Sequence, residues 1–139
     1  FDAFLDKLLK QLSQQFFATG IVIERRLSAI VLGLETAIPC GLIVNELVTN
    51  AFKHAFPGER RGTVSITLAG RDDGQISLTV ADDGVGLPPD LDLGATKSLG
   101  MQLVPLLVDQ SGGTLTVERT GGARFILLLH ADPSRRVSP

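Results

Sequence analysis

A carboxylate, an amide, a cation and an imidazole recur at helical spacing within residues 42–56, LIVNELVTNAFKHAF. They follow the steps i, i+4, i+7 and i+8, so they share one stripe of a helix: Glu46, Asn50, Lys53 and His54. A solvated stripe usually repeats Lys and Glu, and Asn is a poor helix former, so this mixture indicates a site that binds or reacts. The Asn50 amide oxygen suits a hard cation such as Mg²⁺, and Lys53 suits phosphate. Each residue alone is better explained as a surface or capping residue, so the inference depends on the set.

A second group of residues that could do chemistry follows a predicted strand, in the sequence Asp82-Asp83-Gly84-Val85-Gly86. A carboxylate only accepts hydrogen bonds, so Asp82 suits an exocyclic amino group such as that of adenine. Gly84 and Gly86 would let the chain pass close to a flat ligand. A plain glycine-rich turn explains the same residues equally well.

The third group is Ser98-Leu99-Gly100-Met101, where a segment poor in apolar residues meets a predicted helix. Free N–H groups and the dipole at a helix N-terminus attract phosphate, and a simple Ser98 cap is the alternative explanation. The sequence contains neither a Walker A motif nor G-x-G-x-x-G, and its Ser, Cys and His residues form no hydrolase signature.

The composition limits the classes of protein to which the chain can belong. The chain has 139 residues, 44% of them hydrophobic and 20% charged, which predicts one globular, soluble domain with a sizeable core. A net charge of −2 gives no electrostatic case for binding nucleic acid or an anionic membrane. The single cysteine, Cys40, excludes an internal disulfide and fits a reducing, cytoplasmic setting. The apolar runs are too short for a membrane span, and because the chain opens mid-helix at Phe1 we expect a fragment of a longer protein.

Hydrophobic periodicity and turn residues predict the elements that must position these groups. The predicted helices are 2–18, 42–56 and 99–110, and the predicted strands are 21–26, 27–34, 63–69, 75–81, 114–119 and 123–130. Strands 21–26 and 27–34 are expected to form a hairpin, Pro39 to stand at the start of helix 42–56, and Pro105 to kink the last helix. Residues 87–97 are expected to be a mobile loop. Strands that come in hairpins favour an α+β fold, a two-layer α/β sandwich whose mixed, mostly antiparallel sheet carries helices on one face.

In their order along the chain, the three groups resemble the ATP-binding domain of sensor histidine kinases, within the GHKL superfamily. The N box is similar to residues 45–54, the first glycine box to residues 82–86 and the second to residues 98–104. The phrase GLIVNELVTNAFKHAFP resembles most the subgroup related to the HWE kinases. By this resemblance, residues 1–19 are the end of a dimerisation or linker helix, residues 20–131 the ATP-binding catalytic domain, and residues 132–139 a disordered tail.

The resemblance implies the Bergerat fold, with ATP between helix 42–56, a flexible lid at 87–97 and the sheet. Asp82 would accept a hydrogen bond from the adenine amino group, and Asn50 would hold the Mg²⁺ that bridges the phosphates. Glu46 stands where related ATPases carry a general base; in a kinase it would instead orient the attacking imidazole or a metal-bound water, and it is the second candidate ligand of Mg²⁺ after Asn50. The other residues implied to contact ATP are Lys53, His54, Gly84, Gly86, Lys97, Ser98, Leu99, Gly100 and Met101.

The implied function is a protein-histidine kinase of a two-component phosphorelay. It would transfer the γ-phosphoryl group of ATP to a histidine on an upstream helix of the same or a partner protomer, from which phosphate passes to a response regulator. That histidine is not in this chain, so the chain is expected to bind ATP without phosphorylating itself, and to contact neither nucleic acid nor membrane. Two alternatives stay open: a GHKL ATPase or anti-sigma-type serine kinase, and a degenerate nucleotide-sensing module. Three departures from the family pattern, at Asp83, Ser98 and Ala123, bear on affinity more than on fold.

Overall fold

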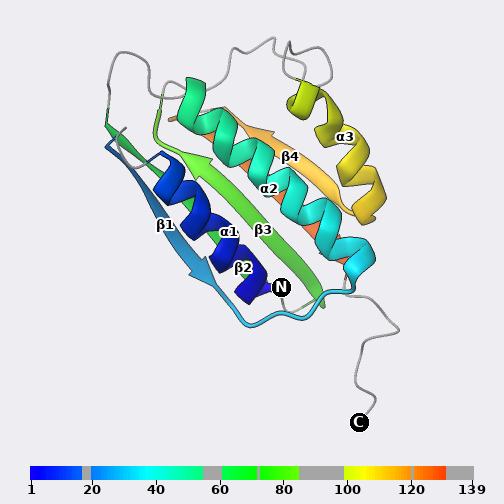
Figure 1. Cartoon of the computed structure of the whole chain (residues 1–139). Coiled ribbons are helices and arrows are strands. Elements are labelled where there is room, and N and C mark those ends of the chain that lie inside the picture. The colour runs from blue at the N-terminus through cyan, green and yellow to red at the C-terminus, as the bar shows by residue number, and fades with distance from the viewer. Residues whose placement is uncertain (17–19, 55–60, 72, 85–98, 120, 131–139) are drawn as a thin grey trace.

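The chain folds into one sheet with three helices packed against one of its faces (Figure 1). The computed structural model describes residues 1–16, 20–54, 61–71, 73–84, 99–119 and 121–130. In chain order the elements are α1 (Asp2–Gln15), β1 (Ile21–Leu27), α2 (Leu34–His54), β2 (Gly62–Gly70), β3 (Gln75–Asp82), α3 (Leu99–Ser111), β4 (Thr114–Glu118) and β5 (Ala123–His130). None of the helices within these residues is both long and apolar enough to span a membrane.

The sheet has the strand order β1-β2-β3-β5-β4. β1 pairs with β2 in parallel, and the other three pairings are antiparallel. The turn between β2 and β3 uses Gly74 at a φ of 81°, which glycine adopts without strain, and the Gln75 N–H donates to Asp73 Oδ1 over 2.9 Å. The predicted α+β class and the mixed, mostly antiparallel sheet with helices on one face are therefore confirmed.

The predicted hairpin of strands 21–26 and 27–34 is wrong. β1 is a single strand that ends at Leu27, and it pairs in parallel with β2 rather than with the residues that follow it. The sequence offers no turn chemistry at the centre of this stretch, and Leu32 is buried beyond the end of the strand. Because parallel neighbours need a crossover, the chain leaves β1, forms α2 and only then returns as β2.

α2 is longer than predicted, because it begins at Leu34 rather than Leu42. The Gly33 carbonyl accepts hydrogen bonds from the N–H groups of Thr36 and Ala37, over 3.0 and 2.8 Å, which starts the helix. Pro39 consequently lies inside α2 and not at its first position. Pro39 has no N–H to donate to the Glu35 carbonyl four residues before it, so α2 lacks one ladder bond in its second turn.

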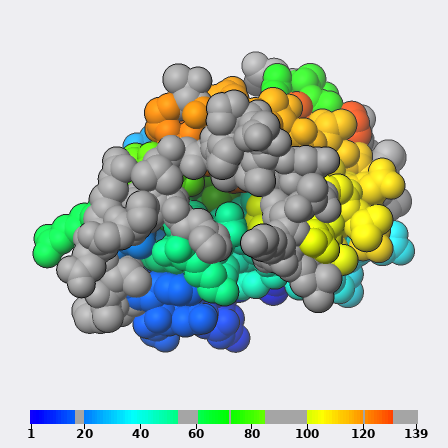
Figure 2. All heavy atoms as spheres, turned by 90° about the horizontal axis from the view of Figure 1, so that it is seen from above, coloured from blue at the N-terminus to red at the C-terminus, as the bar shows by residue number. Residues whose placement is uncertain are grey.

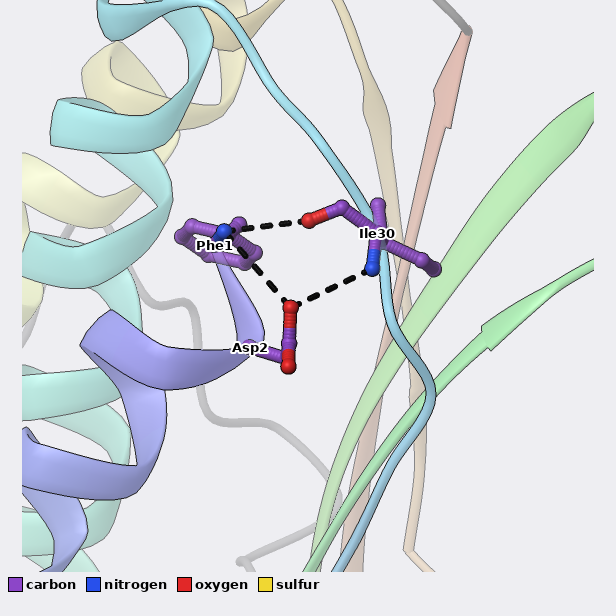
Figure 3. A network of polar contacts seen from close by, with 3 residues as sticks. All are labelled: Phe1, Asp2 and Ile30. Carbon is purple, nitrogen blue, oxygen red and sulfur yellow. Dashed lines mark hydrogen bonds and ion pairs between the residues drawn. The ribbon is translucent and has the colours of Figure 1, made fainter.

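α1 belongs to the same hydrophobic core as α2 and the sheet. Its Leu5, Leu9 and Leu12 are buried among the core residues of both layers. Its first residues are also tied to the segment between β1 and α2: the Phe1 nitrogen donates to the Ile30 carbonyl over 3.0 Å, and the Ile30 N–H donates to Asp2 Oδ1 over 3.3 Å (Figure 3). The domain boundary expected near residue 19 stays a prediction.

Replacing Leu9 with alanine should lower the free energy of unfolding by about 2–5 kcal/mol, because the side chain is fully buried and its removal leaves a cavity. Urea unfolding of the chain measures this. Gln11→Ala, at an exposed position on the same helix, is the matched control and should change the free energy by less than about 0.5 kcal/mol. Equal effects of the two substitutions would mean that α1 does not contribute to the core.

Candidate functional site

α2 carries the polar stripe beside its buried face. Ile43, Val44, Leu47 and Val48 turn into the core, and they are at most 3% exposed. Glu46 and Asn50 are half-buried, and Lys53 is exposed. His54 is the last residue of the helix. The helix therefore brings a carboxylate and an amide together, one turn apart, at a partly sheltered surface.

Asp82 is the last residue of β3, and two backbone groups hold its carboxylate. Oδ1 accepts hydrogen bonds from the Gly84 N–H over 2.9 Å and from the Ala123 N–H over 3.4 Å. Ala123 is the residue opposite Asp82 in the β3–β5 pairing, so the second bond comes from the neighbouring strand. Both bonds fall on Oδ1, which leaves Oδ2 without a hydrogen bond from the described residues. These two bonds fix the orientation of the carboxylate.

Gly122 is a part of this site for which the sequence analysis proposed no contact. Its φ is 111°, and a side chain there would overlap the Asp82 carbonyl oxygen and come within 3.2 Å of the Asp83 Cα. A non-glycine residue would therefore push the start of β5 away from the end of β3, and with it the Ala123 N–H that holds Asp82. The signal was present in the sequence as Gly121-Gly122 directly before a predicted strand.

Asp83 has a structural partner on β2. Its Oδ1 accepts from the Thr63 N–H over 2.8 Å, and its own N–H donates to the Thr63 carbonyl over 3.3 Å. These bonds continue the β2–β3 pairing beyond the last strand residue. Asp83 therefore anchors the chain where it leaves Asp82.

Burial raises the pKa of the Asp82 carboxyl above its ordinary value, and the nearby Asp83 charge adds to this, while the bonds from Gly84 and Ala123 oppose it. A raised folded-state pKa means that the contribution of Asp82 to stability is fully present below its unfolded-state pKa and is lost as pH rises through the folded-state value. The free energy of unfolding of Asp82→Asn minus that of wild type should therefore increase from pH 4 to pH 7. Urea unfolding at several pH values measures it, and a difference that does not change with pH would contradict this account.

α3 brings the second glycine group against α2. Leu99 begins the helix, and Gly100, in its first turn, lies directly against the Glu46 carboxylate. Met101 is 2% exposed and belongs to the core, so its side chain does not face a ligand site. Three of the predicted ATP contacts, Gly86, Lys97 and Ser98, lie outside the described residues, as does the predicted lid at 87–97.

The candidate residues gather at one end of the sandwich. Figure 1 shows the C-terminal ends of α2 and β3 and the N-terminal end of α3 at this end. Figure 2 looks down on it, where atoms of α2 are visible between α1 and α3. Among the described residues no three His, Cys, Asp or Glu side chains gather to hold a metal ion.

Comparison with known proteins identifies relatives of the chain. The family model described as "Histidine kinase-, DNA gyrase B-, and HSP90-like ATPase" matches residues 35–133. The chain is 38% identical over 93 residues to blue-light-activated histidine kinase 2 of Erythrobacter litoralis, which covers 67% of this chain and 27% of that protein. It is 40% identical over 79 residues to the sensor histidine kinase PdtaS of Mycobacterium tuberculosis, covering 56% of this chain and 16% of that protein. The chain thus spans about a quarter or less of these relatives.

A solved structure extends the likeness to the whole fold. The histidine kinase domain of the E. litoralis EL346 blue-light-activated kinase superposes with a TM-score of 0.85 at 30% sequence identity. The match covers 92% of this chain and 63% of that one. The likeness in fold therefore extends over nearly the whole chain.

Proposed function

Because the chain belongs to the histidine kinase-, DNA gyrase B- and HSP90-like ATPase family, we propose that it is the ATP-binding catalytic domain of a sensor histidine kinase. The observation that carries the proposal is the Asp82 carboxylate, which two backbone N–H groups orient while Oδ2 is left for a donor. The exocyclic amino group of adenine is such a donor. The identities to two histidine kinases support the same function.

Several residues of the chain have separate roles in phosphoryl transfer, which requires positioning and charge neutralisation more than covalent chemistry. Asp82 binds the adenine amino group and so sets where the phosphates lie. Asn50 holds Mg²⁺ by its amide oxygen, and Lys53 and His54 meet the phosphate and sugar region. The bound ion supplies charge neutralisation at the phosphates. Glu46 accepts a proton from, or orients, the group that attacks the γ-phosphorus.

The acceptor in this proposal is a histidine outside the chain, on an upstream helix of the same or a partner protomer. The imidazole nitrogen forms a bond to the γ-phosphorus as the bond to the ADP oxygen breaks, and the imidazole proton leaves. Phosphate then passes to a response regulator, and the domain works in the cytoplasm. The relatives in which such domains occur are several times longer than this chain, which supports a partner region elsewhere in the protein.

Calorimetric titration of the chain with ATP, with and without Mg²⁺, tests the first step. Binding that is stronger with Mg²⁺ is expected, and no heat at millimolar ATP would favour a degenerate module that lacks this function. The second step is tested on the full-length protein with γ-labelled ATP. Acid-labile, base-stable label on the protein is expected of phosphohistidine. Acid-stable label would indicate a serine kinase instead, and released phosphate with no labelled protein an ATPase.

A further inference from the structure

Gly100 leaves a space that the Glu46 carboxylate fills. A Cβ built on Gly100 would overlap Glu46 Oε2 and Cδ and lie 2.6 Å from Oε1, whereas real Cβ atoms essentially never come within 3.0 Å of another residue. The three nearest heavy atoms to that position all belong to Glu46. Two elements far apart in sequence, α2 and the first turn of α3, therefore meet at a contact between a bare backbone and a carboxylate.

The backbone conformation does not explain this glycine. Gly100 lies in a helix and is absent from the described glycines with positive φ, so any L-residue could adopt its conformation. Glycine is also the poorest helix former apart from proline. The family resemblance implies that Gly100 contacts ATP, but the space that its missing side chain leaves is occupied by a side chain of this protein. The requirement for glycine at this position therefore comes from Glu46.

We propose that Gly100 is a positioning residue, and that the first turn of α3 is the surface that fixes the direction of the Glu46 carboxylate. The N-terminal end of a helix carries partial positive charge, which favours a carboxylate in contact with it. In this arrangement the position of α3 sets the position of Glu46 relative to the polar stripe of α2. The inference rests on the proposed function, because Glu46 acts on transfer only if ATP phosphates reach this end of the sandwich.

Gly100→Ala displaces the carboxylate without unfolding the protein. The atoms that the new methyl group meets are the far end of a flexible side chain, which can rotate away, and alanine suits a helix better than glycine. We expect an unchanged or higher melting temperature. In the full-length kinase, kcat for phosphoryl transfer should fall by about tenfold to a hundredfold, with a smaller change in KM for ATP, because a misplaced group slows the reaction more than it weakens binding.

A double-mutant cycle distinguishes this role from simple crowding of the nucleotide. Glu46→Gln should lower kcat strongly when residue 100 is glycine and only slightly when it is alanine, because the carboxylate is then already displaced. The proposal is wrong if the two substitutions lower kcat by independent factors that multiply in the double variant. It is also wrong if Gly100→Ala changes only KM for ATP. Gly41→Ala is the matched control: its methyl group would meet the exposed Phe4 ring, 2.5 Å from Cε1, and kcat should not change.

A spectroscopic measurement on this chain keeps the test independent of activity. The carbon-13 signal of the Glu46 carboxyl group should shift in Gly100→Ala and stay in place in Gly41→Ala. An unmoved signal in Gly100→Ala would refute the contact even if the kinase function holds. A shifted signal in a protein that binds no ATP would keep the contact and refute the proposed function.

Discussion

Asp82→Ala should weaken ATP binding by about tenfold to a hundredfold, the loss expected when a hydrogen bond to a charged group is removed. The carboxylate is held by the N–H groups of Gly84 and Ala123, so it binds a ligand without first being ordered. The bonds that hold it are lost with it, so part of the effect comes from the start of β5. Calorimetry on the chain, with ATP and Mg²⁺, measures the change.

The conservative variant Asp82→Asn separates base recognition from support of β5. An asparagine oxygen can keep the two backbone bonds, but its amide group can also donate to the O6 acceptor of guanine. Wild type should prefer ATP to GTP, and Asp82→Asn should lose most of that preference while staying folded. The matched control is Asp83→Asn, on the adjacent residue that bonds to Thr63, and it should keep the preference. An unchanged preference in Asp82→Asn would show that Asp82 does not contact the base.

Asn50→Ala should abolish the dependence of ATP binding on Mg²⁺. In the wild type, Mg²⁺ is expected to raise the affinity by about tenfold or more, which corresponds to about 1.4 kcal/mol or more. In the proposed function the Asn50 amide oxygen is a side-chain ligand of the ion, so its removal should weaken binding of the ion to the ATP-bound domain. Titrations in Mg²⁺ and in EDTA should therefore give the same affinity for the variant.

Two further variants make the Asn50 result specific. Asn45→Ala removes a half-buried amide from another side of the same helix, and it should leave the Mg²⁺ dependence intact. Asn50→Asp keeps a hard oxygen ligand and should retain the dependence. Alanine favours the helical conformation, so neither alanine variant is expected to melt earlier through loss of helix. If Asn50→Ala keeps the full Mg²⁺ effect, the metal assignment is wrong.

The contact between Gly100 and Glu46 has a consequence for how the site is assembled. Asp82 ends β3 and accepts a hydrogen bond from the Ala123 N–H of β5, whereas Glu46 lies on α2 against Gly100 of α3. The proposed base-binding side is therefore held by the β3–β5 pairing and by this bond to the Asp82 side chain. The position of Glu46 depends instead on the packing of α3 against α2, so a shift of α3 is expected to move Glu46 more than Asp82.

Much of the fold was predictable from local patterns. The apolar spacing of α1 and α3, the Asp-Gly turn between β2 and β3, and the glycines before β5 act within a few residues. For the same reason the stripe of α2 was predictable, since residues four apart on a helix must share a side. The place of Asp82 at the end of a strand was also predictable. Apolar and polar residues alternate before it, and glycines follow it.

Only the tertiary structure decided which distant segments meet. The pairing of β1 with β2, the Ala123 N–H beneath Asp82 and the packing of Gly100 on Glu46 all join residues far apart in the chain. Periodicity reports which side of an element is apolar, but it does not report what will cover that side or which strand will be its neighbour. Those choices depend on how the whole core packs, and here the core also determines the surroundings of the candidate catalytic carboxylate.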